Sequence, residues 1–220
     1  VMTAVGVVGG YADGSFNPEA GLTRGAAAKI ICNLILGPTT AAELNADTDP
    51  YVDVAQDSTF AGYIAYCAKE GIVSGYADGT FKPAAPLTGY AFMKMLLGAL
   101  GYDAAVEGYT GANWSINVAK RALNIDLDAG LKGDFTGAKA LTREEAALYA
   151  FNTLKATCVE YKNKSTIAVG DITVSTSAEA SKVANGSGSD FAGKTDTTTM
   201  EFAELYFSKL MLASSVDAYK

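Results

Sequence analysis

The sequence predicts an all-α fold of repeated helix-loop-helix units, followed by a small appendage of mixed structure. A nine-residue stretch at residues 10–18 (GYADGSFNP) recurs 65 residues later at residues 75–83 (GYADGTFKP). Apolar residues at helical spacing flank both copies, and a threonine precedes the second helical stretch each time. Agreement at a constant offset over so many positions identifies an internal repeat.

A third, more degenerate copy follows 54 residues after the second. At this offset Phe81 matches Phe135, and Phe60 matches Trp114. Val1 aligns with the middle of the second unit's first helix, so the first unit is expected to lack its beginning. The predicted organisation is three units and an appendage, over residues 1–37, 51–101, 109–158 and 159–220.

An amphipathic stripe predicts the first helix of a complete unit. In the second unit, apolar residues at positions i, i+4, i+7, i+8 and i+12 form one helical face, namely Phe60, Ile64, Cys67, Ala68 and Ile72. Gly71 lies near the end of this stripe, where a left-handed residue often terminates a helix. The sequence therefore predicts a helix that ends close to Gly71.

The repeated motif itself is predicted to form a loop between the two helices. Its Asp-Gly pair supplies a position with positive φ, and its phenylalanine can plug the loop onto the core. Asp13 and Asp78 are therefore interpreted chiefly as turn formers. A proline follows Asn17 and Lys82, and it biases both residues away from the helical conformation.

The second helix of each unit is expected to begin after a threonine N-cap, at Thr23, Thr88 and Thr142. In the third unit Thr142 and Glu145 also have the spacing of a capping box. The helical period then predicts which side chains face the core, and these are Ala27, Ile30, Ile31 and Leu34 in the first unit, Phe92, Met95, Leu96 and Leu100 in the second, and Ala146, Tyr149, Ala150 and Leu154 in the third.

The linkers and the appendage carry weaker signals. The polar linker 37–53 contains several Asn and Asp residues, but Pro50 stands where a calcium loop needs glycine, so a solvated turn is favoured. In the appendage, weak alternation over residues 161–176 predicts a small hairpin turning at Gly170-Asp171. Residues 177–199 are predicted to form a loop, and residues 200–212 one amphipathic helix.

Composition excludes several functional classes. The 220-residue chain is 49% hydrophobic, carries a net charge of −7 and contains no histidine. The negative charge argues against general binding to nucleic acids or anionic membranes. The absence of histidine excludes Ser-His-Asp and Cys-His catalysis and histidine metal sites. Apolar runs are too short to span a bilayer, and the three cysteines are interpreted as small buried hydrophobes.

The motifs together resemble the S-layer homology (SLH) module. The resemblance lies in the Gly-Tyr-x-Asp-Gly-x-Phe-x-Pro loop followed by a Leu-Thr-Arg-x-x-Ala helix start, and it covers about residues 1–158. Residues 51–54 (YVDV) match the usual unit opening of Phe-x-Asp-Val, with tyrosine in place of phenylalanine. The whole chain is similar to the amino-terminal region of large secreted surface proteins of Clostridia-like bacteria.

The resemblance implies a pseudo-threefold arrangement of the units around a central axis, with grooves between neighbours. In the family these grooves hold a secondary cell-wall polysaccharide that often carries pyruvate ketals, and the arginine of the Thr-Arg-Ala-Glu motif faces the acidic sugar. An arginine fork suits a carboxylate, a helix amino terminus offers free N–H groups, and an aromatic ring can stack on a sugar. The implied location is extracellular, at the bacterial cell wall or surface layer.

The family's motif is only partly present. The first unit keeps Thr23 and Arg24, the third keeps Thr142, Arg143 and Glu145, and the second reads TGYA and loses both charges. At most two grooves therefore retain the arginine. The candidate glycan-binding residues are Tyr11, Asp13, Thr23, Arg24, Tyr76, Asp78, Trp114, Thr142, Arg143 and Glu145.

Structural roles compete with the binding roles. The capping box alone is sufficient to explain Glu145. Arg24 and Arg143 can be solvated residues in the first turn of their helices. Trp114 can be a core or capping aromatic, and Tyr11 and Tyr76 can simply cover their loops.

The leading hypothesis is a non-catalytic module that anchors a larger surface protein to the cell wall, with Arg24 and Arg143 making the charge contacts. Such binding should titrate little between about pH 5 and 8, because arginine stays charged. The alternative is a structural module that assembles with other surface-layer subunits through protein–protein contacts. No catalytic residue, metal site or cofactor is predicted, because the sequence has no histidine, nucleophile elbow, phosphate loop or metal-binding cluster. A glycosidase with paired carboxylates is disfavoured, because the adjacent Glu144 and Glu145 point in different directions from one helix.

Overall fold

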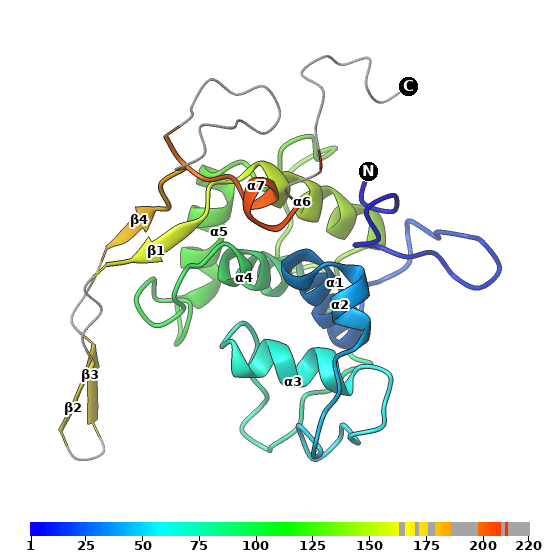
Figure 1. The fold of residues 1–220 in the computed structure, drawn as a ribbon, viewed down its shortest axis with the longest axis horizontal. Helices are drawn as coiled ribbons and strands as arrows, with labels where there is room; N and C mark the ends of the chain where they lie inside the picture. Colours follow the sequence, from blue (N-terminus) through cyan, green and yellow to red (C-terminus); the bar gives the residue numbers. More distant parts are fainter. Residues whose placement is uncertain (163–165, 170–171, 176–178, 186–197, 208–209, 211–220) are drawn as a thin grey trace.

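The computed structural model describes all residues except 163–165, 170–171, 176–178, 186–197, 208–209 and 211–220. The described part is mostly helical (Figure 1). Its helices are α1 (Arg24–Leu36), α2 (Pro38–Ala42), α3 (Ala61–Lys69), α4 (Gly89–Ala99), α5 (Trp114–Asn124), α6 (Arg143–Lys155) and α7 (Phe202–Tyr206). Its strands are β1 (Val159–Tyr161), β2 (Thr166–Val169), β3 (Ile172–Ser175) and β4 (Ala180–Lys182). Within this part, no helix is both long and apolar enough to cross a membrane.

Three helices, α1, α4 and α6, begin at the predicted threonine caps. The hydroxyl oxygens of Thr23, Thr88 and Thr142 each accept a hydrogen bond from the backbone N–H three residues later, at 3.2–3.3 Å. All twelve side chains predicted to face the core from these helices are buried. Local capping and helical periodicity were therefore sufficient to place these three helices.

A closed ring of backbone hydrogen bonds joins the starts of the three helices. Leu22 donates to the carbonyl of Leu141 at 2.8 Å, Leu141 donates to Leu87 at 2.8 Å, and Leu87 donates to Leu22 at 2.9 Å. All three leucines are buried. Each unit is thus bonded to both of the others at the residue immediately before its threonine cap.

The first N–H groups of the same helices bond to loops of other units. Arg24 and Gly25 of α1 donate to carbonyls of the second unit's loop, at 3.0 and 2.9 Å. Gly89 and Tyr90 of α4 donate to the third unit in the same way, at 3.2 and 2.8 Å. For α6 the corresponding donors, Arg143 and Glu144, reach the loop of the first unit at 2.9 and 3.0 Å.

The remaining helices pack around these three. Helix α3 packs on α1, α5 packs on α4, and α7 contacts both α6 and α1. Figure 1 shows α4 beside α1, with α3 on one side of this pair and α7 on the other. Residues 1–8, which align with the end of α3, form a tight turn in which both Val7 and Val8 donate to the carbonyl of Met2.

The repeated loops have the expected backbone, and a carboxylate from the linker holds one of them. Gly14 and Gly79 have φ values of 83° and 80°, and Gly71, just after α3, has a φ of 70°. Lys82 is left-handed, with a φ of 59°. Asp53 accepts hydrogen bonds from the N–H groups of Phe81 at 2.7 Å and Lys82 at 2.8 Å, and so ties the unit opening to its own loop.

The linker and the appendage differ in part from the sequence-based expectation. The linker contains the short helix α2, which was not predicted. The hairpin is confirmed, because β2 and β3 pair antiparallel with Ile167 opposite Val174; its predicted turn, Gly170-Asp171, lies outside the described residues. The predicted loop 177–199 is wrong in one place, since β4 lies within it and pairs with β1. The final helix is shorter than predicted, because α7 ends at Tyr206 and Phe207 is no longer helical; residues 208–209 and 211–212 of the predicted helix lie outside the described residues.

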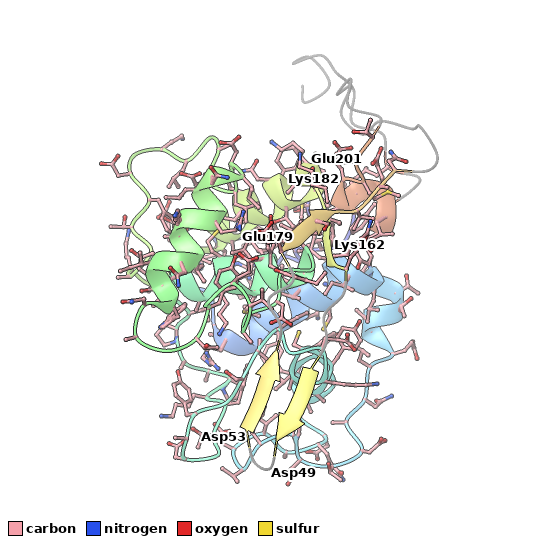
Figure 2. The ribbon with its side chains drawn as sticks, turned by 90° about the vertical axis from the view of Figure 1, so that its left-hand side faces the viewer. Asp49, Asp53, Lys162, Glu179, Lys182 and Glu201 are labelled. Atoms are coloured by element: carbon pink, nitrogen blue, oxygen red, sulfur yellow. The ribbon has the colours of Figure 1, made fainter. Side chains whose placement is uncertain are left out.

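In the described part of the chain, no cluster of three acidic or cysteine side chains is placed to hold a metal ion. The carboxylate of Asp49 instead accepts the backbone N–H of Gln56 at 2.8 Å. Figure 2 shows Asp49 and Asp53 at the end of the molecule opposite Lys182 and Glu201 of the appendage.

The appendage is built into the core, which gives a first prediction. Phe202 is fully buried, and its ring lies 4.4 Å from that of Tyr206, whereas Leu205 of the same helix is 49% exposed. We expect Phe202→Ala to lower the free energy of unfolding by about 3–5 kcal/mol, because it leaves a cavity. Leu205→Ala should change it by less than about 1 kcal/mol. Urea unfolding of both variants measures this, and equal small effects would show that the appendage is not part of the core.

The Asp53 contact predicts a dependence of stability on pH. The hydrogen bond from Phe81, helped by that from Lys82, lowers the pKa of Asp53 below its ordinary value. The stabilisation is therefore present above the ordinary pKa and is lost as the pH falls through the lowered one. We expect Asp53→Asn to reduce the steepness of acid destabilisation measured by urea midpoints between pH 2.5 and 6. Asp57→Asn, at an exposed position between the unit opening and α3, serves as control and should leave that steepness unchanged.

Candidate functional site

Two hollows occupy matching positions in the repeats. The α4 groove, of about 480 Å³, is lined by residues that include Arg24, Tyr76, Thr88, Lys94 and Trp114. The α1 groove, of about 370 Å³, is lined by residues that include Arg143, Tyr11, Thr23, Lys29 and Phe60. Tyrosine, threonine and lysine stand 65 residues apart in the two sets. All three units contribute to each groove. In the α4 groove, Arg24 comes from the first unit, Lys94 from the second and Trp114 from the third. In the α1 groove, Arg143 comes from the third unit, Lys29 from the first and Phe60 from the second.

The two arginines adopt the same pose. Arg24 donates from Nε to the carbonyl of Phe81 at 2.7 Å, and from Nη2 to that of Ser74 at 3.2 Å. Its guanidinium carbon lies 4.4 Å from the centre of the Phe81 ring and 5.0 Å from that of Tyr76. Arg24 thus holds the loop of the second unit through two hydrogen bonds, and its side chain also lines the α4 groove.

Arg143 repeats this arrangement on the first unit. Its Nε donates to the carbonyl of Phe16 at 2.9 Å, and its Nη2 donates to that of Gly9 at 2.6 Å. The guanidinium carbon lies 4.9 Å from the Phe16 ring centre and 4.8 Å from that of Tyr11. These hydrogen bonds use two of the five guanidinium donors, so others remain for a ligand.

A lysine in each groove was missed by the sequence analysis. Lys94 of α4 lies over the ring of Trp114, with its Nζ 5.8 Å from the ring centre, and burial lowers its pKa. Lys29 of α1 lies over the ring of Tyr63 of α3 at 5.5 Å. The signal was present in the sequence, because both lysines follow the threonine cap by six residues. They were overlooked because only the apolar positions of the helices were compared.

The aromatic candidates lie on the groove walls. Tyr76 is 46% exposed and Tyr11 is 47% exposed, and each lines its groove beside the arginine that packs on it. Trp114, at the start of α5, also packs edge-on against Tyr90, with ring centres 6.5 Å apart. These three aromatic side chains present ring surface next to the cations.

The expectation that helix amino termini offer free N–H groups is wrong for α1, α4 and α6. The first two N–H groups of each helix donate to carbonyls of another unit's loop, and the third donates to the threonine cap. These N–H groups are therefore not available to a ligand in the grooves. Thr23 and Thr142 line hollows while their oxygens act as caps.

Three other candidates make structural contacts. Glu145 completes the capping box, because its Oε2 accepts the backbone N–H of Thr142 at 2.8 Å. Asp13 accepts the N–H of Ser15 at 2.9 Å, and Asp78 accepts that of Thr80 at 3.0 Å. Hydrogen bonds from the side chain and the backbone N–H of Ser15 lower the pKa of Asp13, and those of Thr80 lower the pKa of Asp78. Their turn-forming and capping roles are thus visible, and their roles toward a glycan stay predictions.

A third hollow, of about 350 Å³, differs in character. It is lined by residues that include Glu19, Lys139, Glu144, Glu145 and Leu148. Leu148 stands where the other units have a lysine, and Gly89 stands where they have an arginine. The Cα of Gly137 and the ring of Phe135 lie 3.2–3.3 Å from where a Cβ on Gly89 would be, so a larger side chain there would be crowded.

Comparison with known proteins finds the S-layer homology domain. Its family model matches residues 2–28 and 50–89, so the resemblance to this module is confirmed over these two stretches. A surface layer protein of Brevibacillus choshinensis is 29% identical over 130 residues, which are 59% of this chain and 11% of that protein. A middle cell wall protein of Brevibacillus brevis is 27% identical over 159 residues, which are 72% of this chain and 14% of that protein.

A third relative has a different kind of name. A Bacillus anthracis protein named as an uncharacterised cell wall amidase is 24% identical over 151 residues, which are 66% of this chain and 28% of that protein. The chain thus spans a small part of each relative. Together the comparisons identify a cell-surface protein that is associated with the cell wall and located outside the cell.

Proposed function

We propose that this chain is a non-catalytic anchoring module that binds an acidic secondary cell-wall polysaccharide carrying pyruvate ketals. The repeated pairing of an arginine with a lysine beside an aromatic wall, in both the α1 and α4 grooves, carries this proposal. The three repeats form a pseudo-threefold body over about residues 1–158, and the ring of leucine hydrogen bonds supports this arrangement. Residues 159–220 are an appendage to it.

The chemistry of each groove suits a sugar that bears one carboxylate. The guanidinium presents a planar fork of donors to the carboxylate, and its stacking on a tyrosine and a phenylalanine fixes the plane of that fork. The lysine supplies a second cation that can reach a neighbouring oxygen. Tyr11, Tyr76 and Trp114 offer apolar surface to the faces of the sugar rings.

The net charge of −7 is compatible with this binding because the cations are local. A chain with this charge repels polyanions at long range, but screening limits that repulsion to about 8–10 Å at physiological salt. Within a groove, the short-range contacts of two cations dominate. The module therefore selects single acidic residues of a glycan rather than polyanions in general.

The module acts without catalysis, and the amidase relative is compatible with this view. The chain corresponds to 28% of that protein, so a separate region of the relative has room for an enzyme. A second candidate function is assembly with other surface-layer subunits, which the name of the Brevibacillus choshinensis relative, a surface layer protein, favours. Sedimentation of the glycan-free chain separates the two functions, because a monomer that binds glycan excludes assembly as the primary role.

Substitution of Lys29 and Lys94 tests the proposed site with little risk to the fold. The arginines hold loops of other units by hydrogen bonds to their carbonyls, and these two lysines do not hold a loop in that way. We expect Lys29→Met with Lys94→Met to weaken retention on the pyruvate-ketal polysaccharide at least about tenfold, since charged hydrogen bonds contribute about 1.5–3 kcal/mol. Lys69→Met, at an exposed position on α3, should bind as the wild type does. Retention is measured on immobilised polysaccharide.

The same assay tests the arginines and the ketal. Arg24→Lys with Arg143→Lys keeps the charge and removes the fork, and it should weaken binding while circular dichroism remains native. Mild acid removes the ketal from the polysaccharide and should abolish the difference between wild type and variants. Equal retention of every protein on both polysaccharides would contradict the proposed grooves.

Lys94 also predicts the dependence of binding on pH. Because burial lowers its pKa, its charge is lost at a lower pH than that of an exposed lysine, and binding to an anion falls as the pH rises through that value. We expect binding to be nearly constant between pH 5 and 8 and to weaken at alkaline pH. Lys94→Arg should remove the alkaline loss in fluorescence titrations. A steep loss of wild-type binding between pH 5 and 8 would contradict the site.

A further inference from the structure

We propose that Cys32 and Cys67 form a reversible disulfide that cross-links α1 to α3, and thereby the first repeat to the second. The two Sγ atoms lie 3.6 Å apart across the contact between these helices. Both side chains are completely buried. A disulfide needs an Sγ–Sγ distance of about 2.05 Å, so closing the bond requires the sulfurs to approach by roughly 1.5 Å.

The surroundings of the two sulfurs align them with each other. Cys32 donates to the carbonyl of Tyr63 at 3.5 Å, and Cys67 donates to the carbonyl of Ala28 at 3.7 Å. Each acceptor lies one helical turn before the other cysteine, so the two thiols stand at the same level of facing helices. The third cysteine, Cys158, lies next to β1, and no sulfur contact is seen for it among the described residues.

Oxidation of the two cysteines is expected during folding, or when α3 separates locally from α1. Exchange requires a thiolate, and the close contact with the Cys32 thiol together with burial raises the pKa of Cys67 far above its ordinary value. The closed pair is therefore inert. Once α3 separates from α1, water reaches both thiols and a thiolate can form.

The oxidant is a low-molecular-weight disulfide, RSSR. One cysteine thiolate attacks it, forms a mixed disulfide and releases RS⁻. The second thiolate then attacks the protein sulfur of the mixed disulfide, forms the Cys32–Cys67 bond and releases a second RS⁻. The two protons lost by the cysteines end on the two RS⁻ ions, so one RSSR is reduced to two RSH while the cysteine pair is oxidised.

The cross-link would stabilise one binding groove in particular. It closes a loop that contains the linker and α2, and thereby restricts the unfolded chain. It also fixes α3, whose preceding residues Thr59 and Phe60 form a wall of the α1 groove, against α1, which carries Lys29. An extracellular location permits such a bond.

Refolding in a glutathione redox buffer tests the proposal. The reduced, urea-unfolded chain is refolded with oxidised and reduced glutathione, alkylated, digested and examined by mass spectrometry. We expect a peptide linked through Cys32 and Cys67, with Cys158 alkylated. The oxidised protein should melt several degrees higher than the reduced one, and dithiothreitol should reverse this difference.

Variants keep the test decisive. Cys158→Ala should retain both the linked peptide and the rise in melting temperature, whereas Cys32→Ala should lose both while still folding, because alanine fits a buried helical site. Recovery of all three cysteines in alkylated form after refolding, or a link that involves Cys158, would overturn the proposal.

Discussion

The structure depends on where the unsatisfied N–H groups at the starts of α1, α4 and α6 find their acceptors. A helix cannot satisfy its own first donors, and leaving them unpaired near a core is costly. Here a threonine takes one donor of each helix, and the loop of another unit takes two more. The ring through Leu22, Leu87 and Leu141 adds a further connection at each junction. Polar groups that could have weakened a small helical body instead bind its parts together.

This arrangement determines how the grooves can work. The N–H groups at the helix starts are already used, and the arginines serve two purposes. Arg24 holds the loop carbonyls of Phe81 and Ser74 and also faces a groove. A side chain fixed in this way loses little conformational freedom when a ligand arrives, which favours affinity. Lys29 and Lys94 are not held by loop carbonyls in this way, so their side chains can adjust more readily to a ligand.

The features that could be predicted from the sequence were local ones. Threonine caps, the positive φ of Gly14 and Gly79, and the buried faces of three helices all follow from residues within one or two turns of each other. The pairing of β1 with β4 could not be predicted, because its two strands are short and come from distant positions. The acceptors of the helix donors were equally hidden, since they belong to other units.

The candidate site shows the same division. The repeat offset located both arginines and their tyrosines, and comparing polar positions at that offset would also have found Lys29 and Lys94. The sequence could not reveal that α3 brings Cys67 against Cys32, because helix packing rather than spacing creates that contact. It also could not reveal that Glu201, in a segment without repeat character, would be buried.

The closed leucine ring has a consequence for how such a chain can evolve. An open array of repeats can shed a terminal unit and leave its neighbours largely intact. In a ring, removal of Leu87 would leave the carbonyl of Leu22 and the N–H of Leu141 without their partners. The second repeat has glycine in place of the arginine but keeps Leu87, which the closure of the ring requires. Selection to keep the arginine can relax in one repeat, while selection to keep the backbone ring continues to act on all three repeats.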